Sequence, residues 1–176
     1  MSSGLPSREQ ALGLLRKYNC SPQVIRHCIA VADIAVETAR KLEGKGHKIN
    51  IALVEAGALF HDIGRSKTHT IDHAIAGAQI AQSIGLPETV IRIIKRHVGA
   101  GITAEEAQVL GWPKDIYAPQ TLEEKIVSLS DKLIDKSRRM PIESEIERLQ
   151  IKNKHQAAER VRKLNDEITY LLGEKT

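Results

Sequence analysis

Histidine and aspartate side chains stand at positions of this chain where the helical pattern calls for apolar residues. His27, for example, lies one helical turn after Val24 and one turn before Val31, so it points where a core is expected. Burying such groups costs free energy unless a partner satisfies them. The full set of candidate metal ligands is His27, His61, Asp62, His73, His97 and Asp131. Their nitrogen and oxygen donors, without a thiolate, suit Mn, Fe, Co, Ni, Mg or catalytic Zn.

Each candidate has an ordinary explanation when it is taken singly. A buried histidine often bonds a backbone carbonyl, and Asp131 could pair with Lys132. Taken together, four histidines and two aspartates from five expected helices have no obvious one-to-one cationic partners, which predicts a shared cation in a helical bundle. Six ligands exceed what one catalytic ion normally uses. Two interpretations stay open: one metal with substrate-binding histidines, or two metals.

The elements that must position these residues are predicted to be helices. Apolar residues recur at spacings of three and four, and no stretch alternates long enough to indicate a sheet, so we predict an all-α protein. Capping residues place the helix starts at Ser7, Ser21, Asn50, Asp72, Thr103 and Thr121, with Pro87 opening one more. We expect one helix from Ile51 to about Ile63, another from Thr121 through Asp135, and a single long helix beyond Pro141.

The length favours one domain, because 176 residues can bury a substantial core. We expect a short helix in residues 1–20, a metal-binding helical domain in residues 21–140 and a long C-terminal helix in residues 141–176. The last helix carries an apolar stripe that includes Val161, Leu164 and Ile168. That stripe must be covered, either by the domain or by a second copy in a homodimer, and packing within one subunit is the simpler alternative.

Composition and charge exclude several classes of protein. The formal charge of +4 is small and bases alternate with acids, so nucleic acid is not an expected partner. No apolar run is long enough to cross a bilayer, and the N-terminus lacks a signal-peptide pattern. Cys20 and Cys28 form no CxxC pair, as is normal in a reducing compartment. These features predict a cytoplasmic protein without a membrane partner.

The order of the candidate ligands resembles a known signature. His27, the doublet His61-Asp62 within LFHDIGR, and Asp131 within IVSLSDKLID resemble the H…HD…D motif of the HD-domain superfamily of metal-dependent phosphohydrolases, from about Ser21 to Asp135. The resemblance implies a helical HD fold, hydrolysis of a phosphate ester or anhydride, and a first metal site at these four residues. His73 and His97 resemble the extra histidines of binuclear subgroups, in which Asp62 would bridge two ions.

Within this superfamily the chain is most similar to the symmetrical diadenosine-tetraphosphate hydrolases. Its segment between Gly64 and Asp72 is short by comparison, and the GYP motif of the cyclic-di-GMP phosphodiesterases is absent. The resemblance implies a nucleotide or a related small phosphate compound as substrate, and one or two divalent ions (Fe, Mn, Co, Ni or Zn, with Mg as a further alternative) as cofactor.

A bound cation would lower the pKa of its water to about 7 and supply hydroxide at neutral pH. Asp62, Arg65 and Lys132 are the predicted catalytic residues, and Arg65, Arg96 and Lys132 are predicted to bind substrate phosphate. The alternative for each base is an ordinary surface ion pair. The alternative for the whole protein is a non-catalytic HD module that binds a nucleotide or a protein partner.

Overall fold

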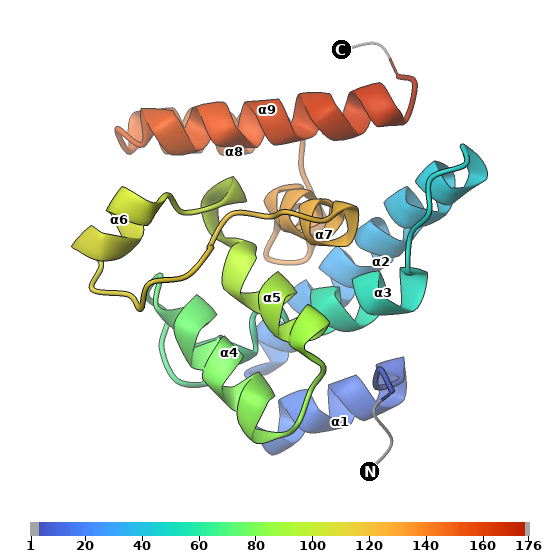
Figure 1. Ribbon diagram of the computed structural model, residues 1–176, viewed down its shortest axis with the longest axis vertical. Coiled ribbons are helices and arrows are strands. Elements are labelled where there is room, and N and C mark those ends of the chain that lie inside the picture. The colour runs from blue at the N-terminus through green and yellow to red at the C-terminus, as the bar shows by residue number, and fades with distance from the viewer. Residues whose placement is uncertain (1–3, 175–176) are drawn as a thin grey trace.

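The computed structural model describes residues 4–174, whose helices are joined by loops (Figure 1). Residues 1–3 and 175–176, at the ends of the expected first and last segments, lie outside the described residues. The first half contains α1 (Arg8–Lys17), α2 (Pro22–Gly44), α3 (Ile51–Phe60), the 3-10 helix η1 (Ile63–Ser66) and α4 (His73–Ser83). The second half contains α5 (Glu88–Arg96), the 3-10 helix η2 (Val98–Ala100), α6 (Ala104–Val109), α7 (Leu122–Lys132), the strands β1 (Ile134–Asp135) and β2 (Arg138–Arg139), α8 (Ile142–Ile151) and α9 (His155–Leu171).

The helix starts follow the predicted capping chemistry. Reciprocal capping boxes begin α1, α6 and α7 at Ser7, Thr103 and Thr121, where each side chain satisfies a free amide of the first turn. Ser21 and Asn50 cap α2 and α3 in the same way. The prediction of an all-α fold is confirmed, and the paired two-residue strands β1 and β2 form a small antiparallel hairpin beside it.

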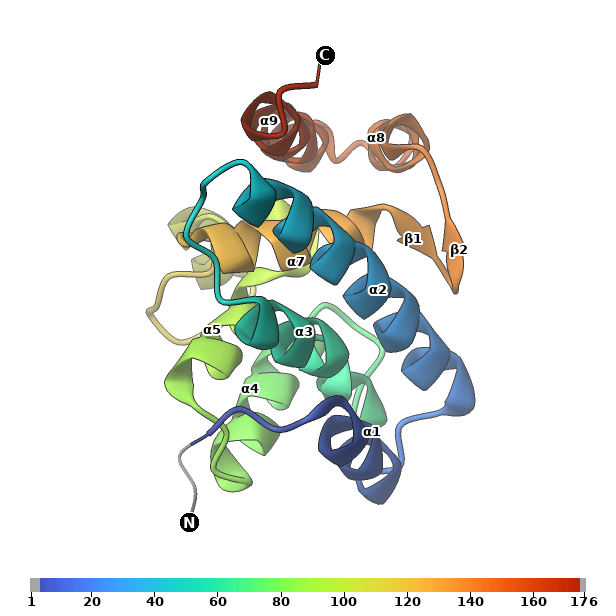
Figure 2. The same ribbon diagram turned by 90° about the vertical axis from the view of Figure 1, so that its right-hand side faces the viewer.

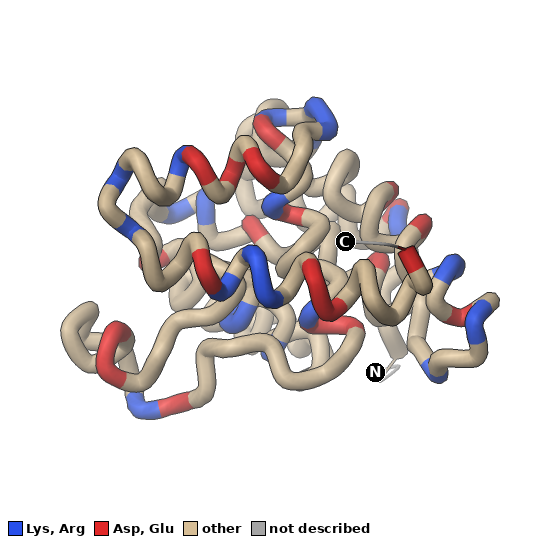
Figure 3. The backbone as a smooth tube through the Cα atoms, turned by 90° about the horizontal axis from the view of Figure 1, so that it is seen from above, with Lys and Arg blue, Asp and Glu red and all other residues tan. Residues whose placement is uncertain are grey.

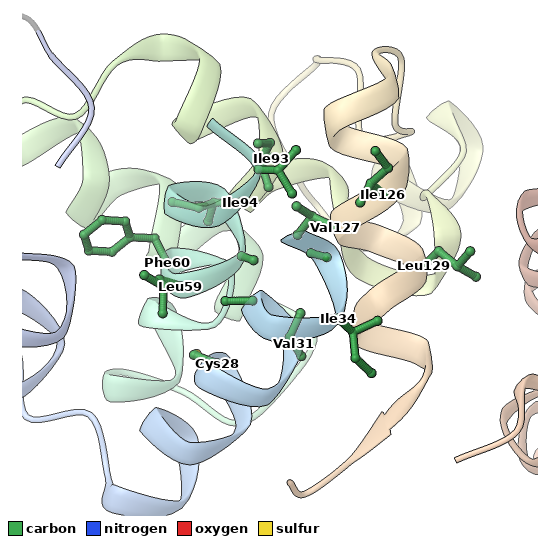
Figure 4. Close-up of a cluster of buried hydrophobic side chains, with 14 of the residues drawn as sticks. Cys28, Val31, Ile34, Leu59, Phe60, Ile93, Ile94, Ile126, Val127 and Leu129 are labelled. Carbon is green, nitrogen blue, oxygen red and sulfur yellow. The ribbon is translucent and has the colours of Figure 1, made fainter. Parts of the chain in front are cut away.

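Helix α3 forms the centre of the domain and contacts α1, α2, α5 and α7. Its close approach to α5 depends on Gly57, where a Cβ atom would lie 2.9 Å from Ile93 Cγ2. Leu59 and Phe60 are fully buried near the C-terminal end of α3, and Ile93 and Ile94 pack from α5 (Figure 4). The His61-Asp62 doublet therefore leaves α3 in the middle of the molecule rather than at its surface.

Two predicted helix ends were wrong, and both lie next to candidate ligands. Helix α3 ends at Phe60 rather than Ile63, and α7 ends at Lys132 rather than Asp135. After α3 the chain tightens into η1, and after α7 it enters the hairpin, which turns at Lys136 with a left-handed φ of 56°. Helical periodicity continued past both ends, so the sequence pattern overestimated their length.

The predicted cap at Asp72 was also wrong in its chemistry. Asp72 precedes α4 but makes no side-chain capping bond. Its carboxylate instead accepts hydrogen bonds from Trp112 Nε1 at 2.7 Å and from Thr70 Oγ1 at 3.1 Å. Asp72 thereby ties the start of α4 to the segment that follows α6.

The segment beyond Pro141 forms two helices rather than the single long helix that we predicted. Helix α8 ends at Ile151, and the chain reverses through Asn153, which adopts a left-handed φ of 57°. The Lys154 amide donates to the Leu149 carbonyl at 2.8 Å and closes the turn. Asn tolerates this conformation at the end of a helix. The two helices lie side by side, and we refer to them as the C-terminal hairpin (Figure 2).

The apolar stripe of the C-terminal hairpin is covered within the same chain. Helix α9 packs on α7 and η2, so Val161, Leu164 and Ile168 are buried. Lysine, arginine and acidic residues are mixed along the outer faces of α8 and α9 (Figure 3). In the described part of the chain, no helix has the length and apolarity needed to cross a membrane.

Candidate metal centre

The six candidate ligands converge in the structure from five different helical segments. His27 comes from α2, Asp131 from α7, and the His61-Asp62 doublet follows α3. His73 is the first residue of α4, and His97 directly follows α5. The cluster lies mainly in the interior, because four of its side chains are at most 5% exposed: His61, Asp62, His73 and His97.

One carboxylate oxygen of Asp62 faces His27 and His61. Each of these histidines has its Nε2 atom 3.8 Å from Asp62 Oδ2. Asp131 joins the same group, with its Oδ1 atom 3.0 Å from His27 Nε2 and 3.5 Å from His61 Nε2. Four side chains thus surround a first position.

The other oxygen of Asp62 faces a second group. Asp62 Oδ1 lies 3.1 Å from His73 Nε2 and 3.6 Å from His97 Nε2. The Nε2 atoms of His73 and His97 are 3.1 Å apart. Asp62 therefore lies between two pairs of imidazoles and presents one oxygen to each.

The second ring nitrogen of each of the four cluster histidines is bound by a backbone carbonyl. The Nδ1 atoms of His61, His73 and His97 each donate at 2.7 Å to the carbonyl three residues earlier, at Ala58, Thr70 and Ile94. His27 Nδ1 donates at 2.9 Å to the Lys136 carbonyl in the β1–β2 turn. A carbonyl oxygen can only accept, so the proton is on Nδ1 and all four Nε2 atoms are left to the cluster.

This arrangement fits a bound cation. His61 Nε2 and Asp62 Oδ1 are buried without a hydrogen-bond partner in the described residues. A hydrogen bond between the Nε2 atoms of His73 and His97 would require one ring to be doubly protonated, because both rings already carry a proton on Nδ1. Buried polar atoms normally have partners. Metal coordination would satisfy these atoms together, and the donor set has the composition expected for a divalent transition metal.

The electrostatics of the cluster also favour positive charge. Burial opposes ionisation of Asp62, but the surrounding imidazoles, His61 first, hold its pKa well below the ordinary value. Burial likewise opposes ionisation of Asp131, and Lys132 and His27 hold its pKa well below the ordinary value. Burial lowers the pKa of His97 to about 4. Two ionised carboxylates and a neutral imidazole therefore face one another in a low-dielectric interior.

The structure brings two of the three predicted phosphate-binding bases to the cluster. Arg65 Nε donates to Asp62 Oδ2 at 2.6 Å, and Lys132 Nζ donates to Asp131 Oδ2 at 2.6 Å. The prediction that Arg96 binds substrate is not supported by its position. Its guanidinium is buried against Glu124, with both carboxylate oxygens within 3.0 Å of Nη1.

Two hollows meet at the cluster. The first, which we call the α2 hollow, has a volume of about 570 Å³ and is lined by His27, Asp62 and Lys136, among others. The second, which we call the hairpin hollow, has a volume of about 1080 Å³ and lies between α6 and the C-terminal hairpin, with His73 and His97 in its wall. Residues that line both hollows are Arg65, His69, Asp131, Lys132, Glu145 and Arg148.

The sequence analysis did not identify the residues of α8 that line these hollows. Glu145 and Arg148 pair with each other at 2.7 Å and line both hollows. No sequence signal identified them, because they come near the cluster only when the C-terminal segment folds back. His69, in the loop after η1, also borders both hollows.

Comparison with known proteins agrees with the ordered ligands. The family model described as HD domain matches residues 24–134, which contain all six candidate ligands. The chain belongs to the HD domain family. The C-terminal hairpin follows the matched region, so these two helices lie outside the residues that the family model describes.

The chain is similar in sequence to three proteins with different names. An uncharacterized protein of Methanocaldococcus jannaschii is 44% identical over 166 residues, which cover 93% of this chain and 98% of that protein. A tRNA (cytidine(56)-2'-O)-methyltransferase of Picrophilus torridus is 41% identical over 96% of this chain, which spans only 48% of that protein. A ribonuclease Y of Acidothermus cellulolyticus is 34% identical over 52% of this chain and 18% of that protein.

Solved structures support the same fold. The HD domain of the L. monocytogenes phosphodiesterase PgpH in complex with cyclic-di-AMP superposes with a TM-score of 0.56. The sequences are 20% identical, and the match covers 93% of this chain and 99% of that domain. At this identity the likeness establishes the HD fold alone, and it extends over the C-terminal hairpin as well as the family region.

Proposed function

We propose that this HD domain is a metal-dependent phosphohydrolase that cleaves a phosphate ester or anhydride of a nucleotide or a related small molecule. The observation that carries the proposal is Asp62, a buried carboxylate between two pairs of imidazoles, with one oxygen that lacks a hydrogen-bond partner in the described residues. The first group (His27, His61, Asp62 and Asp131) would hold one ion. Asp62, His73 and His97 would hold a second.

The chain's own residues have distinct roles in this proposal. The bound metal would supply an activated water nucleophile and neutralise charge on the phosphoryl oxygens. Arg65 and Lys132 fix the orientation of the two carboxylates through their 2.6 Å bonds. Both bases also border the two hollows, so their remaining donors can contact phosphate oxygens.

The test combines metal analysis with turnover. Purified full-length protein is stripped with a chelator, reconstituted separately with Mn, Fe, Co, Ni, Zn or Mg, and assayed against a panel of nucleotides and small phosphate esters. We expect one or two ions per chain and phosphate-bond hydrolysis that disappears in the His61→Ala variant. Absence of stoichiometric metal, or absence of turnover with every metal, would overturn the proposal.

A second candidate function is a non-catalytic binding module. It is favoured by the match to about half of proteins named as tRNA methyltransferases, whose other half this chain does not contain. A binding module would be stabilised by a nucleotide or RNA without releasing any product. Ligand-dependent thermal stabilisation that persists in His61→Ala, with no hydrolysis in the unmodified protein, would favour this alternative.

A further inference from the structure

We infer that the hairpin hollow is a binding site for the neighbouring nucleotide of an oligonucleotide phosphodiester whose scissile phosphate lies at the metal centre. This inference rests on the proposed function and specifies its substrate class. One wall of the hollow is formed by the C-terminal hairpin, which lies outside the region matched by the HD family model.

The position of the two hollows indicates a substrate that continues on both sides of the reacting phosphate. The metal centre forms the border between them, because His27 lines only the α2 hollow while His73 and His97 line only the hairpin hollow. A phosphate monoester has one organic substituent and would occupy one hollow. A phosphodiester has two, so one nucleoside can lie in each.

The wall of the hairpin hollow offers apolar and basic groups that a nucleotide can contact, beside the carboxylates of Glu105 and Glu106. Val98, Val109 and Leu110 supply apolar surface on one side, and Val109 is 89% exposed. An apolar side chain this exposed at the rim of a hollow is available to contact the face of a base. Lys152 and Lys154, at the turn of the C-terminal hairpin, supply positive charge on the other side.

Charge pairing determines where phosphate groups can be held. Arg65, Lys132 and Arg148, near the border, are already paired with Asp62, Asp131 and Glu145. Lys152 and Lys154 have no ion-pair partner among residues 4–174, and neither has Lys136 in the α2 hollow. The unpaired cations thus lie in the hollows on either side of the centre.

This distribution favours a diester over a polyphosphate anhydride. A polyphosphate would bring several negative charges to the centre, where Arg65 and Lys132 are already paired with Asp62 and Asp131. An oligonucleotide carries one charge at the scissile phosphate and its next charge on the neighbouring nucleotide, which would lie in a hollow with unpaired lysines. The inference replaces the expectation that nucleic acid is not a partner, but it places the strand in the hollows rather than on the mixed outer face of α9.

The reaction is a balanced hydrolysis. One water oxygen bonds to phosphorus, and the bond between phosphorus and the 3′-oxygen of the adjacent sugar breaks. That oxygen takes one proton and leaves as a hydroxyl group, and the phosphate remains on the 5′-oxygen of its own nucleoside. Linear 5′-phosphorylated diadenylate (pApA) and one water thus give two AMP.

The experiment uses the full-length chain reconstituted with the metal that supports the highest activity. Its substrates are pApA, AMP, diadenosine tetraphosphate and bis(p-nitrophenyl) phosphate, a diester without nucleosides. We expect kcat/KM for pApA to exceed that for AMP by at least tenfold. The double variant Lys152→Ala/Lys154→Ala should lower kcat/KM for pApA about tenfold, mainly through KM, and leave the rate with bis(p-nitrophenyl) phosphate unchanged.

A matched control removes the same charge elsewhere. The Arg162→Ala/Lys163→Ala variant loses two bases on the outer face of α9, where both pair with Glu159. It should behave like the unmodified protein with every substrate.

A hexameric oligoadenylate distinguishes the two sources of the diester. Its cleavage indicates that the substrate is an RNA strand. Its resistance to cleavage, together with cleavage of pApA, indicates a free dinucleotide. Both results support the inference.

Binding provides a readout that is independent of turnover. The phosphorothioate analogue of pApA should bind in calorimetry about tenfold more weakly to Lys152→Ala/Lys154→Ala than to the control, which corresponds to about 1.4 kcal/mol. Equal binding by both variants, or faster cleavage of diadenosine tetraphosphate than of pApA, overturns the inference while leaving a phosphohydrolase in place. If no phosphate compound is cleaved, the proposed function fails. The comparison of binding between the two variants then decides alone whether the hairpin hollow binds a nucleotide.

Discussion

Arg96 and His97 are neighbours in the sequence, yet their side chains enter two different buried polar clusters. The Arg96 cluster is complete: its guanidinium donates to Glu124 and to the Ile116 carbonyl, and Glu124 also accepts the Gln120 amide at 2.6 Å. The His97 cluster is incomplete, because it leaves Asp62 Oδ1 without a hydrogen bond in the described residues.

The difference shows what separates a structural cluster from a binding site in this fold. In the first cluster, opposite charges cancel and the main donors find acceptors, so nothing further is required. In the second, Arg65 and Lys132 balance the charges of the two carboxylates, but His61 Nε2 and Asp62 Oδ1 have no hydrogen-bond partner in the described residues. Burial alone is common to both clusters, and it is the set of buried polar atoms without hydrogen-bond partners that points to a ligand.

The largest expected effect is at Asp62, which belongs to both metal groups. Asp62→Asn should abolish stoichiometric metal binding and lower kcat by at least about 1000-fold, which corresponds to roughly 4 kcal/mol of transition-state stabilisation. Metal content by mass spectrometry and single-substrate kinetics measure both effects. The control is Asp166→Asn, on the exposed face of α9. Retention of a full metal complement by Asp62→Asn would remove the distinction between the two clusters.

The second prediction concerns the complete cluster. Arg96→Ala or Glu124→Ala should lower the free energy of unfolding by about 3–5 kcal/mol, because each leaves a buried charge without its partner. Denaturant unfolding measures this loss, and the folded fraction should still bind metal. The double variant Arg96→Met/Glu124→Leu should be more stable than either single alanine variant. A folded Arg96→Ala protein that has lost only its metal would show that the two clusters act as one.

The third prediction tests the support of the second metal group. Gly64 packs against the first turn of α4, and a Cβ atom there would lie 2.5 Å from the Gly77 amide nitrogen and closer still to the His73 carbonyl oxygen. Gly64→Ala should therefore cost about 1–3 kcal/mol of stability. By displacing His73 it should also weaken metal affinity about tenfold or more. Titration calorimetry and unfolding measure the two effects.

The glycine of α1 provides the matched control for this substitution. Gly13 is exposed in the middle of α1, and a Cβ atom there would meet nothing within 4 Å. Gly13→Ala should be neutral or stabilising by up to about 1 kcal/mol, because Ala favours the helix. If the two alanine variants bind metal equally well, the close contact at Gly64 does not position His73.

The smallest predicted effect lies one step further from the metal centre. Trp112→Phe removes the 2.7 Å bond to Asp72, which ties down the residue before His73. We expect a loss of about 1 kcal/mol in stability and a decrease of only a few-fold in metal affinity. Tyr117→Phe is the control, because it removes a hydrogen bond to the Pro113 carbonyl in the same small core without touching α4. Equal metal affinities in both variants would contradict a positioning role for Trp112.

The sequence predicted the parts of the molecule that depend on local chemistry. Capping boxes such as that at Thr121 located helix starts, because a hydroxyl and an acidic side chain three residues apart satisfy free amides wherever the helix lies. The inward positions of His27 and Asp131 followed from helical spacing. The structure then brought these residues together with the other four candidates.

The parts that depend on long-range packing could not be predicted in this way. Helix α8 ends at Ile151, and Asn153 adopts the left-handed conformation that reverses the chain. A single Asn does not require a reversal, so the turn that creates the hairpin hollow gave no clear signal. Arg96 was expected to bind substrate phosphate. Its partner Glu124 lies 28 residues away, and nothing local identified the pair.

The carbonyl bonds of the four histidines imply an order of assembly for the centre. His61, His73 and His97 are each oriented by a residue three positions earlier, so their tautomers are set as soon as the adjoining helix ends form. His27 instead depends on Lys136, 109 residues away, in the β1–β2 turn. The first metal position therefore gains its last correctly oriented imidazole only when the turn before the C-terminal hairpin has docked, which links metal capture to completion of the whole fold.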